Sequence, residues 1–407
     1  MPTYNFVARK RDGAKEKGSV TADNRQAAMA ILQSRGLVPD MLNERSKVFS
    51  LGGGAGRLNR RVKTADLLVF TRQLSTIVSA GLPLLQGLDI LAEQTDDPNF
   101  AAVIEAVAQD VESGETFSDA LRRYPKAFPD LYVSMVKAGE AGGDLDGVLL
   151  QLADYLEATE DLKRRIKSAM TYPVVAFSLI VLIAAGLIIW VVPQFAEIFN
   201  SFGRQLPAPT RILIATSDFL RTWYSVPLIV LAIFGIVAAM RLYGSTDSGR
   251  YHLDMLKLRI PIFGKLLSKV SVSRVTRTLS TLTRSGVPIL QALEIVERTA
   301  GNEVYAKAIK DAGDSVRNGD TLADPLARSE VFPAMVTRMI AVGEKTGALE
   351  TMLMKISDFY DSEVRATVDA LTSIIEPVLI GMMGVVVGGI VIALFMPILQ
   401  LSSLVST

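Results

Sequence analysis

Two long stretches of the chain carry no charged residue. One fills the nineteen positions between Pro173 and Pro193, and the other fills the nineteen between Pro377 and Pro397. At ~1.5 Å per residue, a helix of that length crosses the ~30 Å hydrocarbon layer of a bilayer. A shorter apolar stretch, 226–240, is flanked by tryptophan and tyrosine, which favour the membrane interface. The pattern predicts three transmembrane helices, which are 170–193, 223–243 and 374–399.

The basic residues indicate how these helices are oriented. Four lysines and arginines lie within 163–167, just before the first predicted helix, and four more closely follow the second. The loop 194–222 holds only three arginines, and the tail 400–407 holds no charge. Because basic residues collect on the cytoplasmic side, we expect a multi-pass protein of the bacterial inner membrane. Its N-terminus would be cytoplasmic, and the loop 194–222 and the C-terminus would be periplasmic.

The segments on the predicted cytoplasmic side are two copies of one unit. Residues 70–86 and 275–291 are identical at nine of seventeen positions, with an offset of 205. Farther along the offset becomes 204, which pairs Gly139-Glu140 with Gly343-Glu344 and each span-entry proline with its counterpart. A domain followed by a membrane span has therefore been used twice.

Each copy has the periodicity of a helical bundle and no strand pattern. Gly81 suits a left-handed helix end, and Pro83 suits the first turn of the following helix. Thr116 and Thr321 each precede an aspartate by three residues, as in a capping box on a short fourth helix. A sixth helix beginning near Asp144 is expected to continue into the membrane. The predicted cytoplasmic segments are a first bundle, 63–169, a connector, 244–270, and a second bundle, 271–373.

The N-terminal region has a different pattern. Short alternating segments around one capped helix predict a small α+β module over 1–45. Residues 46–62 contain a run of glycines that predicts a flexible linker. The run lacks the Gly-Lys-Ser/Thr ending of a phosphate loop. The predicted fold class is an all-α integral membrane protein, with two tandem six-helix cytoplasmic bundles, three transmembrane helices and this N-terminal module.

Composition narrows the possible chemistry. Hydrophobic residues make up 49% of the chain, and the net charge of +1 gives no reason to expect nucleic-acid binding. The chain has no cysteine and a single histidine, His252, so thiol chemistry, disulfides, histidine metal clusters and a conventional catalytic triad are excluded. We expect no enzymatic activity, no cofactor and no metal site. The apolar cores of the predicted spans lack the ionisable residues that transporters place in the membrane, and Glu376 lies at a boundary beside Pro377, so a transporter is a distant alternative.

Several repeated or unusual residues have two interpretations. Glu140 and Glu344 either bond within their own bundles or form a partner contact that is used twice, and Arg72 and Arg277 are similarly ambiguous. No spacing indicates a cation among carboxylates at a subunit interface. In the last span, Gly384 and Gly388 form a G-x-x-x-G pair, which either permits close helix packing or is simply tolerated there.

The repeated segments FTRQLSTIVSAGLPLLQGL and VTRTLSTLTRSGVPILQAL, together with KAGEAGGDLDGVL and AVGEKTGALETML, resemble the type II secretion system protein F family. That family includes the inner-membrane platform proteins of type IV pilus machines. The resemblance covers essentially the whole chain. The positions that match family signatures are Arg72, Gly81, Pro83, Gly139, Glu140, Gly143, Arg277, Gly286, Pro288, Gly343, Glu344 and Gly347.

The resemblance implies a homo-oligomeric platform protein. Its expected partners are a cytoplasmic hexameric ATPase, bitopic inner-membrane proteins, and the pseudopilins or pilins that the machine lifts out of the bilayer. The segment FPDLYVSMVKAGEAGG resembles secretion members, whereas the ending IEPVLIGMMGVVVGGIVIALFMPI resembles pilus members. On this basis we expect a secretion platform, with a pilus-assembly platform as the alternative.

Overall fold

The computed structural model describes residues 3–9, 15–21, 27, 29, 31, 38–44, 61–195 and 207–405. The chain divides into two units, and the boundary in the sequence falls between Arg60 and Arg61. Most of the predicted linker 46–62 and part of the predicted loop 194–222 lie outside the described residues.

The first unit contains a three-stranded antiparallel sheet. Its strands are β1 (Thr3–Arg9), β2 (Lys15–Thr21) and β3 (Val38–Glu44), in the order β2-β1-β3. Tyr4 pairs with Val20 on one side and with Glu44 on the other. Of the helix expected within 24–35, only Ala27, Met29 and Ile31 are described, and they are helical.

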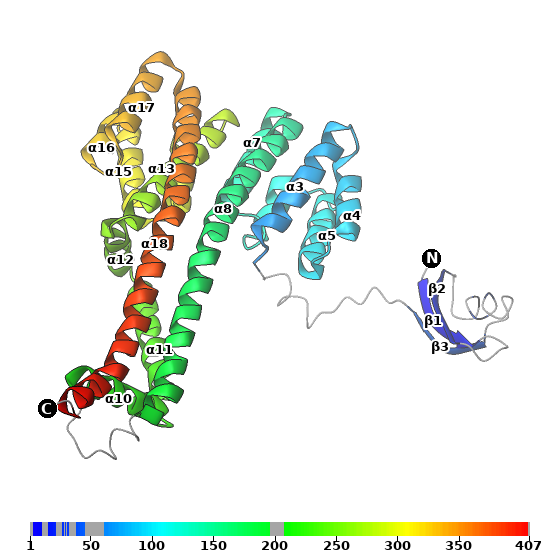
Figure 1. The fold of residues 1–407 in the computed structure, drawn as a ribbon. Coiled ribbons are helices and arrows are strands. Elements are labelled where there is room, and N and C mark those ends of the chain that lie inside the picture. The colour runs from blue at the N-terminus through cyan, green and yellow to red at the C-terminus, as the bar shows by residue number, and fades with distance from the viewer. Residues whose placement is uncertain are drawn as a thin grey trace. The chain divides into compact units, whose positions relative to one another are not determined.

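The second unit is helical throughout its described residues (Figure 1). Its first part is a helical bundle over residues 64–169, called bundle 1 here. It consists of α3 (Thr64–Ser79), α4 (Leu84–Gln94), α5 (Pro98–Glu112), α6 (Phe117–Arg122), α7 (Asp130–Gly142) and the first part of α8 (Leu145–Gly186).

The second copy, called bundle 2, repeats this order over residues 263–373. It consists of α13 (Phe263–Arg284), α14 (Ile289–Thr299), α15 (Glu303–Arg317), α16 (Ala323–Arg328), α17 (Ala334–Thr346) and the first part of α18 (Leu349–Val405). Helix α13 begins at Phe263, inside the predicted connector. The remainder of that connector forms α12 (Asp247–Arg259), whose Asp254 carboxylate accepts a hydrogen bond from the backbone N–H of Glu303 at 2.9 Å.

The cores of the two bundles correspond. In bundle 1 the rings of Phe100 and Phe128 lie 6.1 Å apart, and their counterparts in bundle 2, Tyr305 and Phe332, lie 5.2 Å apart. All four side chains are buried. Aromatic pairs at these distances stabilise a core beyond the area that they bury.

Two helices are long and apolar enough to cross a membrane: 145–195, which contains α8, and 349–397, which is most of α18. Both run without interruption from a bundle into an uncharged stretch, as expected for the sixth helix of bundle 1. Figure 1 shows α8 in green and α18 in red extending from the bundles toward α10. Helix α18 continues to Val405, so the predicted tail 400–407 is largely helical. The shorter α11 (Ser225–Tyr243) meets the same criterion only together with α12, from which it is bent by 115°.

The predicted loop 194–222 contains a helix, α10 (Ala208–Arg221), that packs against the ends of α8 and α18. Its Thr210 hydroxyl donates to the Ala393 carbonyl at 2.5 Å. Its Ser217 hydroxyl donates to the Ile188 carbonyl at 2.6 Å, within the short π-helical turn η1 (Leu187–Val191) that continues α8. Serine and threonine satisfy backbone carbonyls in this way where helices pack closely.

Candidate functional site

The repeated glycines and prolines shape equivalent helix junctions. Gly81 ends α3 with φ 81° and Gly286 ends α13 with φ 78°, a left-handed conformation that glycine adopts without steric cost. Gly143 and Gly347 end α7 and α17 in the same way, at 71° and 69°. Pro83 and Pro288 are the N-cap residues of α4 and α14, so each lies one residue before the expected first turn.

Glu140 and Glu344 bond to backbone within their own bundles. The two carboxylate oxygens of Glu140 accept the N–H groups of Phe117 and Ser118, at 2.6 and 3.0 Å. Those of Glu344 accept the N–H groups of Leu322 and Ala323, at 2.5 and 3.0 Å. Each glutamate therefore satisfies donors at the start of the short fourth helix, which has no preceding helical turn to bond them.

The local caps of the fourth helices differ between the repeats. In bundle 1 the Thr116 hydroxyl accepts the N–H of Asp119 at 3.3 Å, as the predicted capping box requires. In bundle 2 the N-cap residue of α16 is Leu322, which has no side-chain acceptor. The prediction that Thr321 caps this helix is therefore wrong. Although α16 begins one position later than α6, Glu344 bonds the N–H groups of Leu322 and Ala323, the counterparts of Phe117 and Ser118.

Gly139 and Gly343 lie where α7 and α17 pack against the following long helices. A Cβ atom on Gly139 would lie 3.0 Å from the Val148 side chain, and one on Gly343 would lie 2.9 Å from Leu349 Cα. These glycines are required for close packing. Gly384 and Gly388 differ, because a Cβ atom there would meet no atom within 4 Å among the described residues of the chain.

Arg72 and Arg277 form repeat-related ion pairs in different environments. Arg72 binds Glu157 on the surface of bundle 1, where the side chains are 37% and 62% exposed. Arg277 binds Asp361, the counterpart of Glu157, with exposures of only 14% and 9%. Burial by itself lowers the pKa of Arg72, but hydrogen bonds and charge from its carboxylate partners outweigh burial and raise that pKa.

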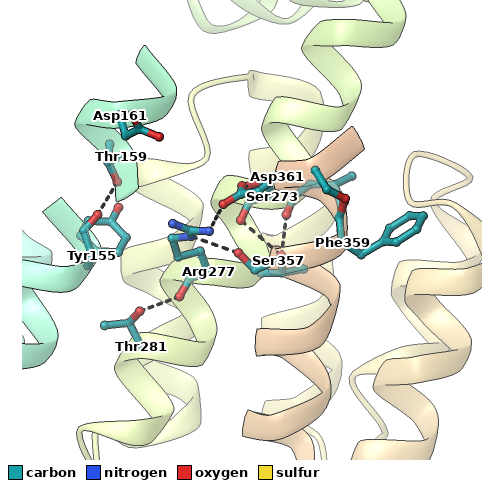
Figure 2. Close-up of polar contacts among 12 residues, drawn as sticks. Tyr155, Thr159, Asp161, Ser273, Arg277, Thr281, Ser357, Phe359 and Asp361 are labelled. Carbon is teal, nitrogen blue, oxygen red and sulfur yellow. Dashed lines mark hydrogen bonds and ion pairs between the residues drawn. The ribbon is translucent and has the colours of Figure 1, made fainter. Parts of the chain in front are cut away.

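The buried pair has further polar support, shown in Figure 2. The Ser273 hydroxyl donates to Asp361, and Arg277 Nε donates to the Ser357 hydroxyl at 3.0 Å. Ser273 and Ser357 are themselves buried. Buried charges need such partners because the surrounding protein does not solvate them as water does.

The Arg277 cluster lies at the contact between the two bundles. There the Tyr155 hydroxyl of α8 is 3.3 Å from the Thr278 hydroxyl of α13. The Ser285 hydroxyl donates to Gln151 at 2.9 Å. A cavity of about 350 Å³ lies between these elements and is lined by residues of α8 and by Ser273, Arg277 and Asp361. We call the α8 side of this contact, with Gln151, Tyr155, Thr159 and Leu162, the cover face.

The signature residues do not converge on one site. The structure places them in two equivalent sets, one in each bundle, where they end helices, cap helices, permit close packing or form ion pairs. Within the part of the chain that the structure describes, no three histidine, aspartate or glutamate side chains are placed to hold a metal ion. Sequence reasoning missed Ser273, Ser357 and Asp361. The repeat offset identifies Asp361 as the counterpart of Glu157, but the sequence does not indicate its burial.

Comparison with protein families agrees with this duplicated architecture. A family model described as type II secretion system protein F matches residues 70–193 and again 275–397, and a model for its N-terminal domain matches residues 1–40. The chain belongs to the type II secretion system protein F family. The two separate matches confirm the predicted internal repeat.

Members of the protein F family are non-enzymatic inner-membrane platform proteins of type II secretion and type IV pilus machines. Similar proteins carry both kinds of name. Type IV pilus assembly protein PilC of Myxococcus xanthus is 42% identical over 402 residues, 98% of this chain and 95% of that protein. PilC of Thermus thermophilus is 43% identical, over 98% of each chain. Type II secretion system protein F of Vibrio cholerae is 35% identical over the full length of both.

Proposed function

We propose that this chain is the platform on which a type IV pilus machine assembles its filament, with the type II secretion platform as the second candidate. The similar pilus assembly proteins are 35–43% identical to this chain, with those of Myxococcus and Thermus at 42% and 43%, whereas the secretion proteins are 33–35% identical. This difference favours the pilus branch over the secretion branch that the local segments had suggested.

The observation that carries the proposal is helical continuity. Helices α8 and α18 each begin inside a bundle and extend, without a loop, through an uncharged stretch long enough to cross a bilayer. A displacement or rotation of a bundle would therefore reach a membrane segment, because one helix joins the two with an internal proline, Pro173 in α8 and Pro377 in α18, but no loop. A platform driven by a cytoplasmic ATPase requires this coupling.

The proposed topology has three transmembrane helices with both bundles in the cytoplasm. Helix α11 would return the chain, so the N-terminus would be cytoplasmic and the C-terminus periplasmic. The basic residues of 163–167 support this orientation. Reporter fusions after residues 165 and 365 should both report the cytoplasm. A periplasmic signal from either one would overturn this topology.

The proposed partners are the hexameric ATPase, bitopic inner-membrane proteins and pilin or pseudopilin subunits. The twelve signature positions would act in these contacts by holding the helix junctions of each bundle in shape. Charge reversal at Glu140 and Glu344 together should impair assembly while the protein still inserts, because both fourth helices would lose the carboxylate that accepts two of their N-terminal N–H groups. Normal assembly by that double variant would contradict this role.

The coupling is tested by interrupting one helix. A four-residue Gly-Ser insertion after Ala169 breaks α8 between bundle 1 and the membrane segment. In a strain lacking the native gene, this variant should insert into the membrane and assemble no filament. The matched control carries the same insertion after Gly54, in the predicted linker, and should retain assembly. Filaments made by the α8 variant at the control level would refute the proposal.

A further inference from the structure

In the contact between the two bundles, α8 of bundle 1 packs on α13 and α18 of bundle 2, and the α3 surface equivalent to that of α13 stays open. In bundle 2, Thr278 and Thr281 of α13 lie beneath α8 and are 0% and 6% exposed. Their counterparts in bundle 1, Gln73 and Thr76 of α3, are exposed. We call the α13 surface the seat, and the exposed α3 surface around Val69, Gln73 and Thr76 the open seat.

The cover face has an open counterpart too. The repeat offset of 204 makes Phe359 on α18 the counterpart of Tyr155. In the same way, Ser362 and Ala366 are the counterparts of Ala158 and Leu162. Phe359 is 45% exposed. Figure 2 shows its ring on the opposite side of α18 from Arg277. We call this surface, with Phe359, Ser362 and Ala366, the open cover.

We propose that the open cover of one copy of this chain packs on the open seat of a second copy, in the manner in which the cover face packs on the seat within one chain. The same molecule thus exposes a second copy of each surface that forms the internal contact, the open seat and the open cover. The contact is heterologous, so each copy uses one surface toward each neighbour, and repetition gives a ring or a row in the membrane.

The chemistry of the open surfaces suits this pairing. Val69 and Phe359 are large apolar side chains that are 56% and 45% exposed on bundles outside the membrane segments. Within the chain, Thr159 and Arg277 line one cavity. Their counterparts are Glu363, which pairs with Lys269 in its own chain at 2.8 Å, and Arg72, which pairs with Asp154 and Glu157. This register would therefore place two existing ion pairs side by side.

Single cysteines test the proposal cleanly because the chain has none of its own. Within one chain Ser285 and Gln151 are in contact, and their counterparts on the open surfaces are Ala80 and Lys355, both exposed. Differently tagged full-length A80C and K355C chains are co-expressed in membranes and treated with a short bismaleimide. We expect a cross-linked dimer that contains both tags.

Three controls make the result decisive. A single chain carrying Q151C and S285C should cross-link internally, which verifies that the reagent spans the contact. E105C, exposed on α5 away from the open seat, should give at least tenfold less dimer with K355C. Adding Phe359→Glu to the K355C chain should reduce the dimer several-fold, because a charge would replace the apolar centre of the contact.

Two outcomes would overturn the proposal. One is the absence of the A80C–K355C dimer when the internal control cross-links fully. The other is a dimer of A80C with itself in equal yield, which would indicate an isologous contact between identical surfaces. Either result leaves the proposed platform function intact, because filament assembly by the native chain is measured separately.

Discussion

Replacing Arg277 by methionine should destabilise bundle 2 far more than replacing Arg72 destabilises bundle 1. The Arg277→Met variant leaves the Asp361 carboxylate 9% exposed, with Ser273 as its remaining hydrogen-bond donor among the described side chains. Removing one partner of a buried ion pair costs about 3–5 kcal/mol, since the other charge stays buried without compensation. The Arg72 pair is surface-exposed, so its loss should cost no more than about 1 kcal/mol.

Hydrogen exchange of the full-length protein in detergent, followed by mass spectrometry, measures this difference bundle by bundle. A loss of about 3 kcal/mol corresponds to roughly a hundredfold faster exchange, because ~1.4 kcal/mol is tenfold in an equilibrium. Amides of α13 and of the first part of α18 should respond in Arg277→Met, and those of α3 should change less than about fivefold in Arg72→Met.

The double variant Arg277→Met/Asp361→Leu separates lost charge pairing from lost packing. Removing both charges leaves no buried carboxylate, so most of the protection lost in the single variant should return. Equal exchange rates in Arg277→Met and Arg72→Met would refute the reasoning. The reasoning would also fail if the double variant lost more stability than the Arg277→Met and Asp361→Leu variants lose in sum.

Further predictions follow from individual contacts. Gly139→Ala should destabilise α7 by about 1–3 kcal/mol because its Cβ would meet Val148 at 3.0 Å, whereas Gly142→Ala, with open space around it, should be neutral or stabilising in thermal unfolding. Glu140→Ala should cost about 2–4 kcal/mol by leaving two N–H groups of α6 without their acceptor, and should speed hydrogen exchange in that helix while α16 stays unchanged. Thr210→Val should loosen α10 by about 1 kcal/mol through the lost bond to Ala393, and should increase thiol labelling of a Leu213→Cys probe severalfold; unchanged labelling would show that the hydroxyl contributes nothing.

Hydrophobic periodicity and the repeat predicted most of the helical architecture, because both signals are local or compare the chain with itself. Gly81 marked a helix end correctly, because glycine adopts the left-handed conformation without steric cost. The uncharged stretches predicted two membrane helices by length alone. Helices α10 and α12 were missed because both are short, and a helix of about fourteen residues depends on tertiary contacts such as Thr210 to Ala393 that the sequence does not reveal.

The candidate site was less predictable for a different reason. Arg72 and Arg277 occupy equivalent positions in similar sequence contexts, yet one pair is exposed and the other is buried. Burial here depends on where α8 lies, which is a property of the tertiary arrangement. Local sequence contains no signal for it.

The residues around the two ion pairs nevertheless differ in a way that matches the burial of each pair. Where Arg277 and Asp361 are buried, two serine hydroxyls, Ser273 and Ser357, complete their hydrogen bonding. The repeat offset places Leu68 and Ala153 at those positions in bundle 1. Water solvates an exposed pair, so no neighbouring hydroxyl is needed there, whereas a desolvated pair without such partners would be unstable.

This contrast constrains what binds the open seat. A partner that sealed Arg72 and Glu157 from water as completely as α8 seals the buried pair would have to supply the missing polar groups itself. The open cover offers the Ser362 hydroxyl at the counterpart of Ala158, and beside it, at the counterpart of Thr159, the Glu363 carboxylate that Lys269 already binds at 2.8 Å. A purely apolar partner face would leave the guanidinium and its carboxylates without enough hydrogen-bond partners. Burying charged groups in that state costs on the order of several kcal/mol. The surface that carries its own acceptor is therefore the better match for Arg72.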